Sequence, residues 1–140
     1  MMNVELWDER LREMYMPGKS KISVGRYIDA WKYSVKAFGK GNVSSVFIIG
    51  LENEFVEREA IDKIISCGVM PSIMPFRPND GTTLENFRLP DPKVVYKLTE
   101  YAATSAKIQG ISYEHAPGCL GCGACAAEKD FISIEENENE

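Results

Sequence analysis

Three cysteines stand close together near the end of the chain, in Gly118-Cys119-Leu120-Gly121-Cys122-Gly123-Ala124-Cys125. Two C-x-x-C steps place three thiols within seven residues, and the glycines between them let the backbone curl tightly. Thiolates that converge in this way bind a metal ion or an iron–sulfur cluster. The pattern therefore predicts a metal or cluster site with Cys119, Cys122 and Cys125 as ligands.

The fourth ligand of this site is open. The spacing matches the first three ligands of a bacterial ferredoxin motif, but Ala126-Ala127-Glu128-Lys129 stands where the fourth cysteine and its proline would be. His115, the distant Cys67, another chain or a small molecule could supply it, and we expect Cys67 to be an ordinary buried thiol. With His115 the set is Cys₃His, which zinc accepts. The ferredoxin-like Gly-Cys-Gly-Ala-Cys favours iron–sulfur.

Length and composition place this site in a small protein of the cell interior. The chain has 140 residues, of which 44% are apolar. This fills one core but is short of a complete barrel of roughly 200 residues or more. Without an apolar leader or a membrane-length run, we expect a cytoplasmic protein with no membrane partner and with reduced cysteines. The net charge of −5 excludes a strong nucleic-acid surface, and the acidic residues 132–140 predict a disordered tail.

Short apolar runs alternate with amphipathic stretches along the rest of the chain. The pattern predicts strands over residues 2–6, 43–49 and 69–76, and helices over residues 26–38, 54–66 and 93–109. This alternation is typical of parallel strands joined by right-handed crossovers. We therefore predict an α/β fold, with three βα units in residues 1–112, a cysteine-rich metal segment in residues 113–131 and the acidic tail after it.

Ligands of parallel sheets bind beyond the carboxyl ends of the strands, so the loops that follow the strands are the candidate sites. Lys19 lies in the first of these loops, Gly50 and Leu51 in the second, and Arg77 in the proline-rich third. Lys19 and Arg77 are candidates for an anionic group of a small-molecule substrate. Arg77 has the better case because Pro78 limits the backbone beside it.

Three motifs carry a family resemblance: Asn3-x-Glu5, Ile48-x-Gly50-Leu51 and Pro78-x-x-Gly81-Thr82-x-Leu84. In order and spacing they resemble the second half of a radical S-adenosylmethionine enzyme of the biotin synthase-like branch. The resemblance covers residues 2–110. It implies that the three strands are the fourth, fifth and sixth of a partial TIM-type barrel that binds S-adenosylmethionine.

The resemblance also implies roles for single residues. Asn3 and Glu5 would contact the ribose or the methionine part of the nucleotide. The family's adenine contacts would come from the following residues: Gly50 and Leu51, which also pack against methionine, and the backbone around Phe76 and Pro78.

Two departures limit what this chain does alone. Glu52-Asn53 stands where the family has a Gly-Glu pair, and the C-x-x-x-C-x-x-C loop of the family's first strand is absent from the sequence. We therefore expect the carboxyl-terminal portion of an enzyme, inactive without an amino-terminal half that lies on another polypeptide, or a truncated frame or excised piece. Uncovered strand edges predict association with that half or with a second copy. The alternatives are a stand-alone metal-binding or electron-transfer module and a structural zinc protein.

The location of the cysteines depends on Ile111-Ser112-Tyr113-Glu114. One more strand here would bring the cysteines to the rim that carries the nucleotide loops. An irregular segment would leave them at the opposite rim, near Cys67. The alternation of apolar and polar residues favours the strand.

Overall fold

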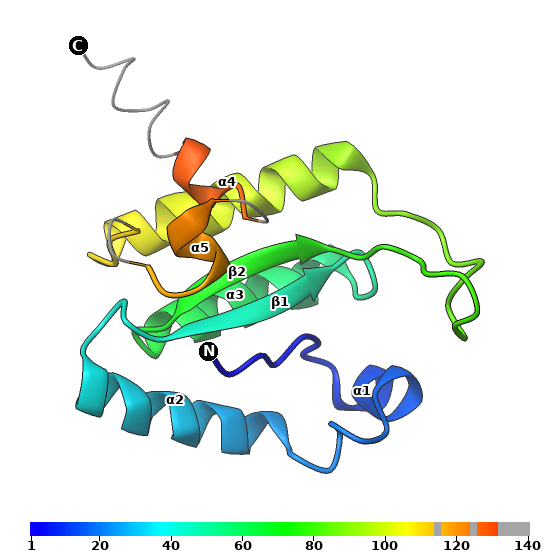
Figure 1. The fold of residues 1–140 in the computed structure, drawn as a ribbon, viewed down its shortest axis with the longest axis horizontal. Helices are drawn as coiled ribbons and strands as arrows, with labels where there is room; N and C mark the ends of the chain where they lie inside the picture. Colours follow the sequence, from blue (N-terminus) through cyan, green and yellow to red (C-terminus); the bar gives the residue numbers. More distant parts are fainter. Residues whose placement is uncertain (114–115, 124–125, 132–140) are drawn as a thin grey trace.

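The structure is a computed structural model, in which residues 1–113, 116–123 and 126–131 are described. Its elements follow the order α1 (Glu9–Tyr15), α2 (Val24–Phe38), β1 (Ser44–Ile49), α3 (Glu54–Ser66), β2 (Met70–Pro75), α4 (Pro92–Ile108) and α5 (Cys119–Cys122). One further helical turn covers residues 128–131 (Figure 1). None of the helices in these ranges has the length and apolar character that crossing a membrane requires.

The long helices begin where side-chain caps are available. Ser23 caps α2, Asn53 caps α3 and Asp91 caps α4, each by accepting a hydrogen bond from a backbone N–H of the first turn. The three predicted helices are thus confirmed within two residues at each end. The sequence pattern missed α1, which is short and begins after Asp8, whose carboxylate accepts from Arg10 N and Leu11 N.

The sheet joins three segments in parallel. β1 pairs with β2 from Ser44–Met70 to Ile49–Pro75. Residues 2–6, here called the first segment, run along the other side of β1 and form one isolated bridge, between Glu5 and Phe47. The predicted parallel arrangement is therefore present, although the first segment is no regular strand. The barrel itself stays a prediction.

The two faces of the sheet differ in how they are covered. Phe47, Ile49 and Ile73 belong to the main core, and α3 and α4 pack against β2. In Figure 1, α3 passes behind the strands and α5 lies in front of them. On the opposite face of the sheet, Ser44 and Ser72 are completely buried. Both lie in the amino-terminal halves of their strands. Three apolar residues nearer the carboxyl ends are half-buried, and we call them the open face: Val46, Ile48 and Met74.

Residues 111–113 form no strand, so the expected extra strand is wrong for these residues, and Glu114 lies outside the described part. The reason is the end of α4. Gly110 has a φ of 68°, and Ile111 N–H donates back to the Ala106 carbonyl at 2.9 Å. This glycine-dependent helix end turns the chain inward, and Ile111 and Tyr113 become part of the core.

Candidate functional site

Glu5 ends the first segment in a strained backbone conformation. Its φ is 66°, and Leu6 N–H donates to the Val4 carbonyl at 2.9 Å, which makes Glu5 the centre of a γ-turn. A non-glycine residue in this region costs on the order of 1–3 kcal/mol and persists only where other contacts hold it. The Glu5 carboxylate forms an ion pair with Lys19. The ammonium of Lys19 also donates to the Asn3 carbonyl at 3.4 Å, so three predicted site residues lie together.

The Asn3 side chain takes part in strand pairing. Its Oδ1 accepts from Val46 N at 3.3 Å, and the neighbouring Val4 N–H donates to Ser45 Oγ at 3.1 Å. These side-chain bonds stand where backbone partners would be in a regular ladder. Asn3 therefore helps to hold the first segment against β1. The charged groups beside it are the Glu5 carboxylate and the Lys19 ammonium.

Arg12 stabilises the turn around Glu5. Its guanidinium is completely buried, and Nη1 donates to the Val4 and Leu6 carbonyls at 2.6 and 3.0 Å. Nη2 donates to the Ile22 carbonyl at 2.9 Å. One side chain thus satisfies the carbonyls on both sides of Glu5 and ties them to the loop that carries Lys19. Nothing in the sequence indicates this role, because Arg12 looks like any charged residue of a short surface helix.

Two glutamates organise the loop after β1. The Glu52 carboxylate accepts from Trp7 N at 2.9 Å and from Asp8 N at 2.5 Å, which joins this loop to the one after the first segment. Glu57 accepts from Gly50 N at 2.6 Å. Burial raises the pKa of both carboxyls, and these backbone donors offset part of that effect. In the sequence, Glu52-Asn53 stands in place of the family's Gly-Glu pair. This was the one indication that the carboxylates of this loop are arranged differently from those of the family.

Gly50 is covered by the third loop. Its φ is 97°, and a Cβ built on it would lie 2.6 Å from Cβ of Pro90. Only glycine fits this close approach. Leu51 beside it is half-buried. The loop after β2 therefore returns across the end of β1 before α4 begins.

The third loop has an apolar cavity beside Arg77. Phe76 N–H continues the ladder by donating to the Ile49 carbonyl at 2.9 Å, and its ring packs edge-on against Phe87 at 5.8 Å. Arg77 is exposed, and Pro78 after it is half-buried. The cavity has a volume of about 250 Å³ and is lined by Pro75, Phe76, Arg77, Leu89, Pro90, Pro92 and Val95. Arg77 is the one charged residue of this lining.

Two cysteines of the run over residues 119–125 belong to the described part of the chain, and they share one helical turn. Cys119 and Cys122 are three residues apart on α5, and Cys122 Sγ lies 3.5 Å from the Cys119 carbonyl oxygen. Cys119 is half-buried and Cys122 is exposed. Cys125 and His115, which the sequence predicted as further ligands, lie outside the described residues. Within residues 1–113, 116–123 and 126–131, no three potential ligands gather into a metal site.

The cysteine turn lies toward the amino ends of the strands. A Cβ on Gly118 would lie 2.5 Å from Sδ of Met1, and Met2 N–H pairs with the Ser44 carbonyl at the beginning of β1. The expectation that the cysteines emerge beside the nucleotide loops is therefore wrong for Cys119 and Cys122. The cause is the inward turn at Gly110, which replaces the extra strand. Cys67 is buried at the end of α3.

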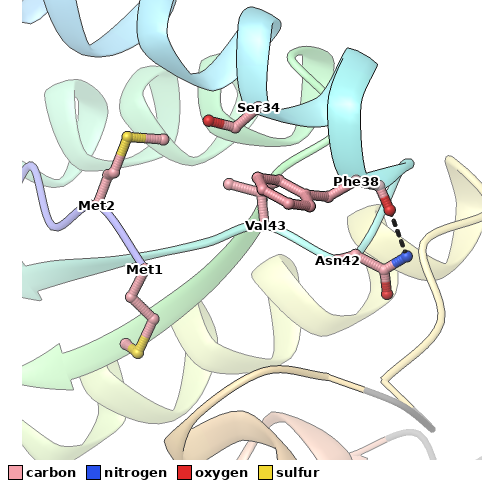
Figure 2. Close-up of a pocket in the computed structure, with 6 residues that line it drawn as sticks. All are labelled: Met1, Met2, Ser34, Phe38, Asn42 and Val43. Atoms are coloured by element: carbon pink, nitrogen blue, oxygen red, sulfur yellow. Dashed lines mark hydrogen bonds between the residues drawn. The ribbon is translucent and has the colours of Figure 1, made fainter.

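A larger cavity of about 350 Å³ lies at the beginning of β1. Figure 2 shows its lining, which consists of Met1, Met2, Ser34, Phe38, Asn42 and Val43. The Asn42 side chain donates to the Phe38 carbonyl at 2.9 Å. None of the lining side chains is charged, so these side chains offer shape but little chemistry.

Comparison with known proteins gives a partial similarity to an enzyme. Over 78 residues, the chain is 36% identical to bacteriochlorophyllide c C-7(1)-hydroxylase of Chlorobaculum limnaeum. The aligned part is 54% of this chain, and it spans only 19% of the hydroxylase. No protein-family model and no solved structure gives a significant match.

Proposed function

We propose that this chain is the carboxyl-terminal portion of a radical S-adenosylmethionine enzyme and forms one wall of the pocket for the nucleotide and substrate. The observation that carries the proposal is that the loops after three parallel segments are bound to one another at one rim. Glu52 joins the first two loops, and Pro90 packs the third against Gly50. The residues of the family resemblance lie on these loops or on the segments directly before them.

The residues of this rim fit S-adenosylmethionine in chemistry. When bound beside a reduced cluster, S-adenosylmethionine supplies a 5′-deoxyadenosyl radical that abstracts hydrogen. The Glu5 carboxylate would accept from ribose hydroxyls or the methionine ammonium, and the Phe76 ring and the open face offer apolar contact for adenine. Contact of adenine with Gly50 would require Pro90 to move first, because Pro90 covers this glycine.

The named activity of the partial relative supports this direction. A hydroxylase that acts at a carbon position must break a carbon–hydrogen bond, which is the step a 5′-deoxyadenosyl radical performs. The C-x-x-x-C-x-x-C loop is absent from the sequence. We therefore propose that a second polypeptide or region supplies it, and that the isolated chain is inactive.

The substrate we propose is a molecule with an apolar ring surface and a carboxylate. A bacteriochlorophyllide has this character, and the partial similarity motivates the choice. Arg77 would pair with the carboxylate at the mouth of the proline-lined cavity, where apolar atoms cover the ring. Lys19 is the second cation near the rim, and Glu5 occupies it in this structure.

Cys119, Cys122 and Cys125 would bind an additional iron–sulfur cluster or a zinc ion. The first two share one side of a helical turn, as two ligands of one centre must. His115 or a small molecule would complete the set. Because α5 lies toward the amino ends of the strands, we propose that this centre is structural or transfers electrons and makes no contact with S-adenosylmethionine.

Binding of S-adenosylmethionine tests the proposed pocket. Calorimetry on the full chain should show weak binding or none, and adding a polypeptide with the C-x-x-x-C-x-x-C half-barrel should produce binding that Glu5→Gln and Phe76→Ala weaken. Phe38→Ala, at the other end of the sheet, is the matched control. Tight binding by the chain alone that neither rim variant changes would overturn the placement of the pocket.

Anaerobic reconstitution with iron and sulfide tests the cysteine site. Visible absorption at about 400 nm should appear in the parent and in Cys67→Ser, and it should be lost or altered in each variant of Cys119, Cys122 or Cys125. Zinc retention that requires His115 would favour Cys₃His. Full metal retention in Cys122→Ser would overturn the site.

A further inference from the structure

The outer edge of β2 has an unusual set of backbone groups. Met70 N–H donates to the Val43 carbonyl and Phe76 N–H donates to the Ile49 carbonyl, at 2.8 and 2.9 Å. Since backbone groups alternate in direction along a strand, the amides at positions 70, 72, 74 and 76 face β1. Those at positions 71, 73 and 75 face the outer edge.

Two of these three outward positions are prolines. Pro71 and Pro75 have no N–H, so Ile73 provides the single backbone donor of this edge. Its N–H donates to Oε1 of Glu128 at 2.6 Å, and Glu128 is completely buried. A pairing strand needs a donor at every second residue, and this edge offers one donor that is already used.

We propose that the outer edge of β2 is a docking surface that excludes strands and accepts a single carboxyl group, and that its occupant is Glu128. The contact would fix the cysteine turn on the sheet whether or not a metal is bound. This inference goes beyond the proposed function and does not depend on it.

The contacts of Glu128 fit the role of an anchor. Glu128 begins the turn over residues 128–131, and the next residue, Lys129, donates from Nζ to the Gly121 carbonyl at 3.0 Å. Gly121 lies within α5, directly before Cys122. A short chain of contacts therefore runs from Ile73 through Glu128 and Lys129 to the cysteine turn.

The interior around Glu128 satisfies one of its two carboxyl oxygens, the Oε1 that accepts from Ile73 N–H. Its Oε2 and the hydroxyl of Tyr113 are buried, and the described part of the chain provides no hydrogen-bond partner for either of them. The two residues interact electrostatically. A buried polar group in such a place is costly unless its one good bond forms. The bond to Ile73 N–H is therefore what makes the position of Glu128 tolerable.

Amide hydrogen exchange of the full-length chain, resolved by NMR, tests the anchor. In Glu128→Ala we expect protection of the Ile73 amide to fall about tenfold. The amides of Cys122 and Gly123 should lose protection with it. Glu128→Gln, which keeps an acceptor, should behave like the parent, and exposed Glu100→Ala is the control. The Ile48 amide, bound to the Glu5 carbonyl, should stay protected in all variants. Unchanged protection of Ile73 in Glu128→Ala would overturn the anchor.

A second experiment tests the exclusion of strands. Glu128→Ala alone leaves one donor on the edge and should keep the parent's mass by light scattering. Adding Pro71→Val and Pro75→Val restores the missing donors, and this triple variant should form larger species as concentration rises. A triple variant with the parent's mass at every concentration would overturn the claim that the prolines close this edge.

Discussion

The two edges of the small sheet are closed by different chemistry. Along the first segment, side chains supply hydrogen-bond donors to backbone carbonyls. Arg12 donates to the Val4 and Leu6 carbonyls, and Lys19 donates to the Asn3 carbonyl. Along β2, donors are removed by prolines, and one acceptor covers the donor that remains. Side chains can move away, whereas a proline cannot regain an N–H. We therefore expect that another strand is added more easily at the first segment than at β2.

Of the substitutions that test this comparison, removal of Arg12 should lower the free energy of unfolding most. Arg12→Met removes the donor of the buried Leu6 carbonyl and one of the two donors of the Val4 carbonyl, so we expect a loss of about 3 kcal/mol or more in the free energy of unfolding. Urea unfolding measures it. Arg10→Met, on the exposed side of the same helix, should change stability by about 0.5 kcal/mol or less. Equal effects of the two variants would contradict the role assigned to Arg12.

The β2 edge should respond to pH through Glu128. Burial raises the pKa of this carboxyl, and the Tyr113 phenol is the titratable group that interacts with it. A raised folded-state pKa stabilises the fold fully below the unfolded pKa, and this stabilisation is lost as pH rises through the folded pKa. Glu128→Gln should therefore match the parent at about pH 4 and exceed its stability at about pH 8.

Urea titrations of both proteins across this range give the comparison. Glu52 and Glu57 also have raised pKa values, but they are common to both proteins and cancel in the difference. A difference in stability that is constant with pH would show that Glu128 does not change its protonation on folding.

Relief of the backbone strain at Glu5, in the first segment, should change stability by a smaller amount. Glycine adopts a φ of 66° without the steric cost that other residues have, so Glu5→Gly should be more stable than Glu5→Ala by about 1 kcal/mol. Both variants lack the ion pair with Lys19, which isolates the backbone term. Thermal unfolding followed by circular dichroism is sufficient. An alanine variant as stable as the glycine variant would mean that the turn relaxes at no cost.

Lys19→Met should have the smallest effect. The ion pair with Glu5 is partly exposed, with 39% of the Lys19 side chain accessible, and such pairs contribute about 1 kcal/mol or less. The difference from the parent should shrink further at high salt. A loss comparable to that of Arg12→Met would make Lys19 an equal partner in closing this edge.

The helices and the parallel order of the strands could be predicted from the local sequence pattern. The contacts that cover the two edges of the sheet could not. The apolar spacing predicted α3 over its full length. The alternation in residues 111–114 was too short to predict a strand against the helix-ending effect of Gly110. Arg12 and Glu128 could not be predicted as edge partners, because such contacts depend on residues far apart in the chain. Pro71 and Pro75 were a usable signal, since two prolines four residues apart lie on the same edge of a strand.

The candidate site was predictable in part for the same reason. Loops after parallel strands are the expected binding rim, and Asn3, Glu5 and Lys19 do meet there. The cover of Pro90 over Gly50 depends on how a loop of more than ten residues returns to α4. No local rule predicts this return. The role of the cysteine segment at the β2 edge was equally hidden.

The prolines of β2 also bear on the order in which the chain folds. Glu128 meets Ile73 across 55 residues of sequence, and Val4 of the first segment meets Ser45 of β1 across 41, so both contacts close long loops and should form late. The β1–α3–β2 unit is more local and can form earlier, with its outer edge still bare. During that interval Pro71 and Pro75 already prevent pairing with other chains. We therefore expect the prolines to limit aggregation even before Glu128 covers this edge.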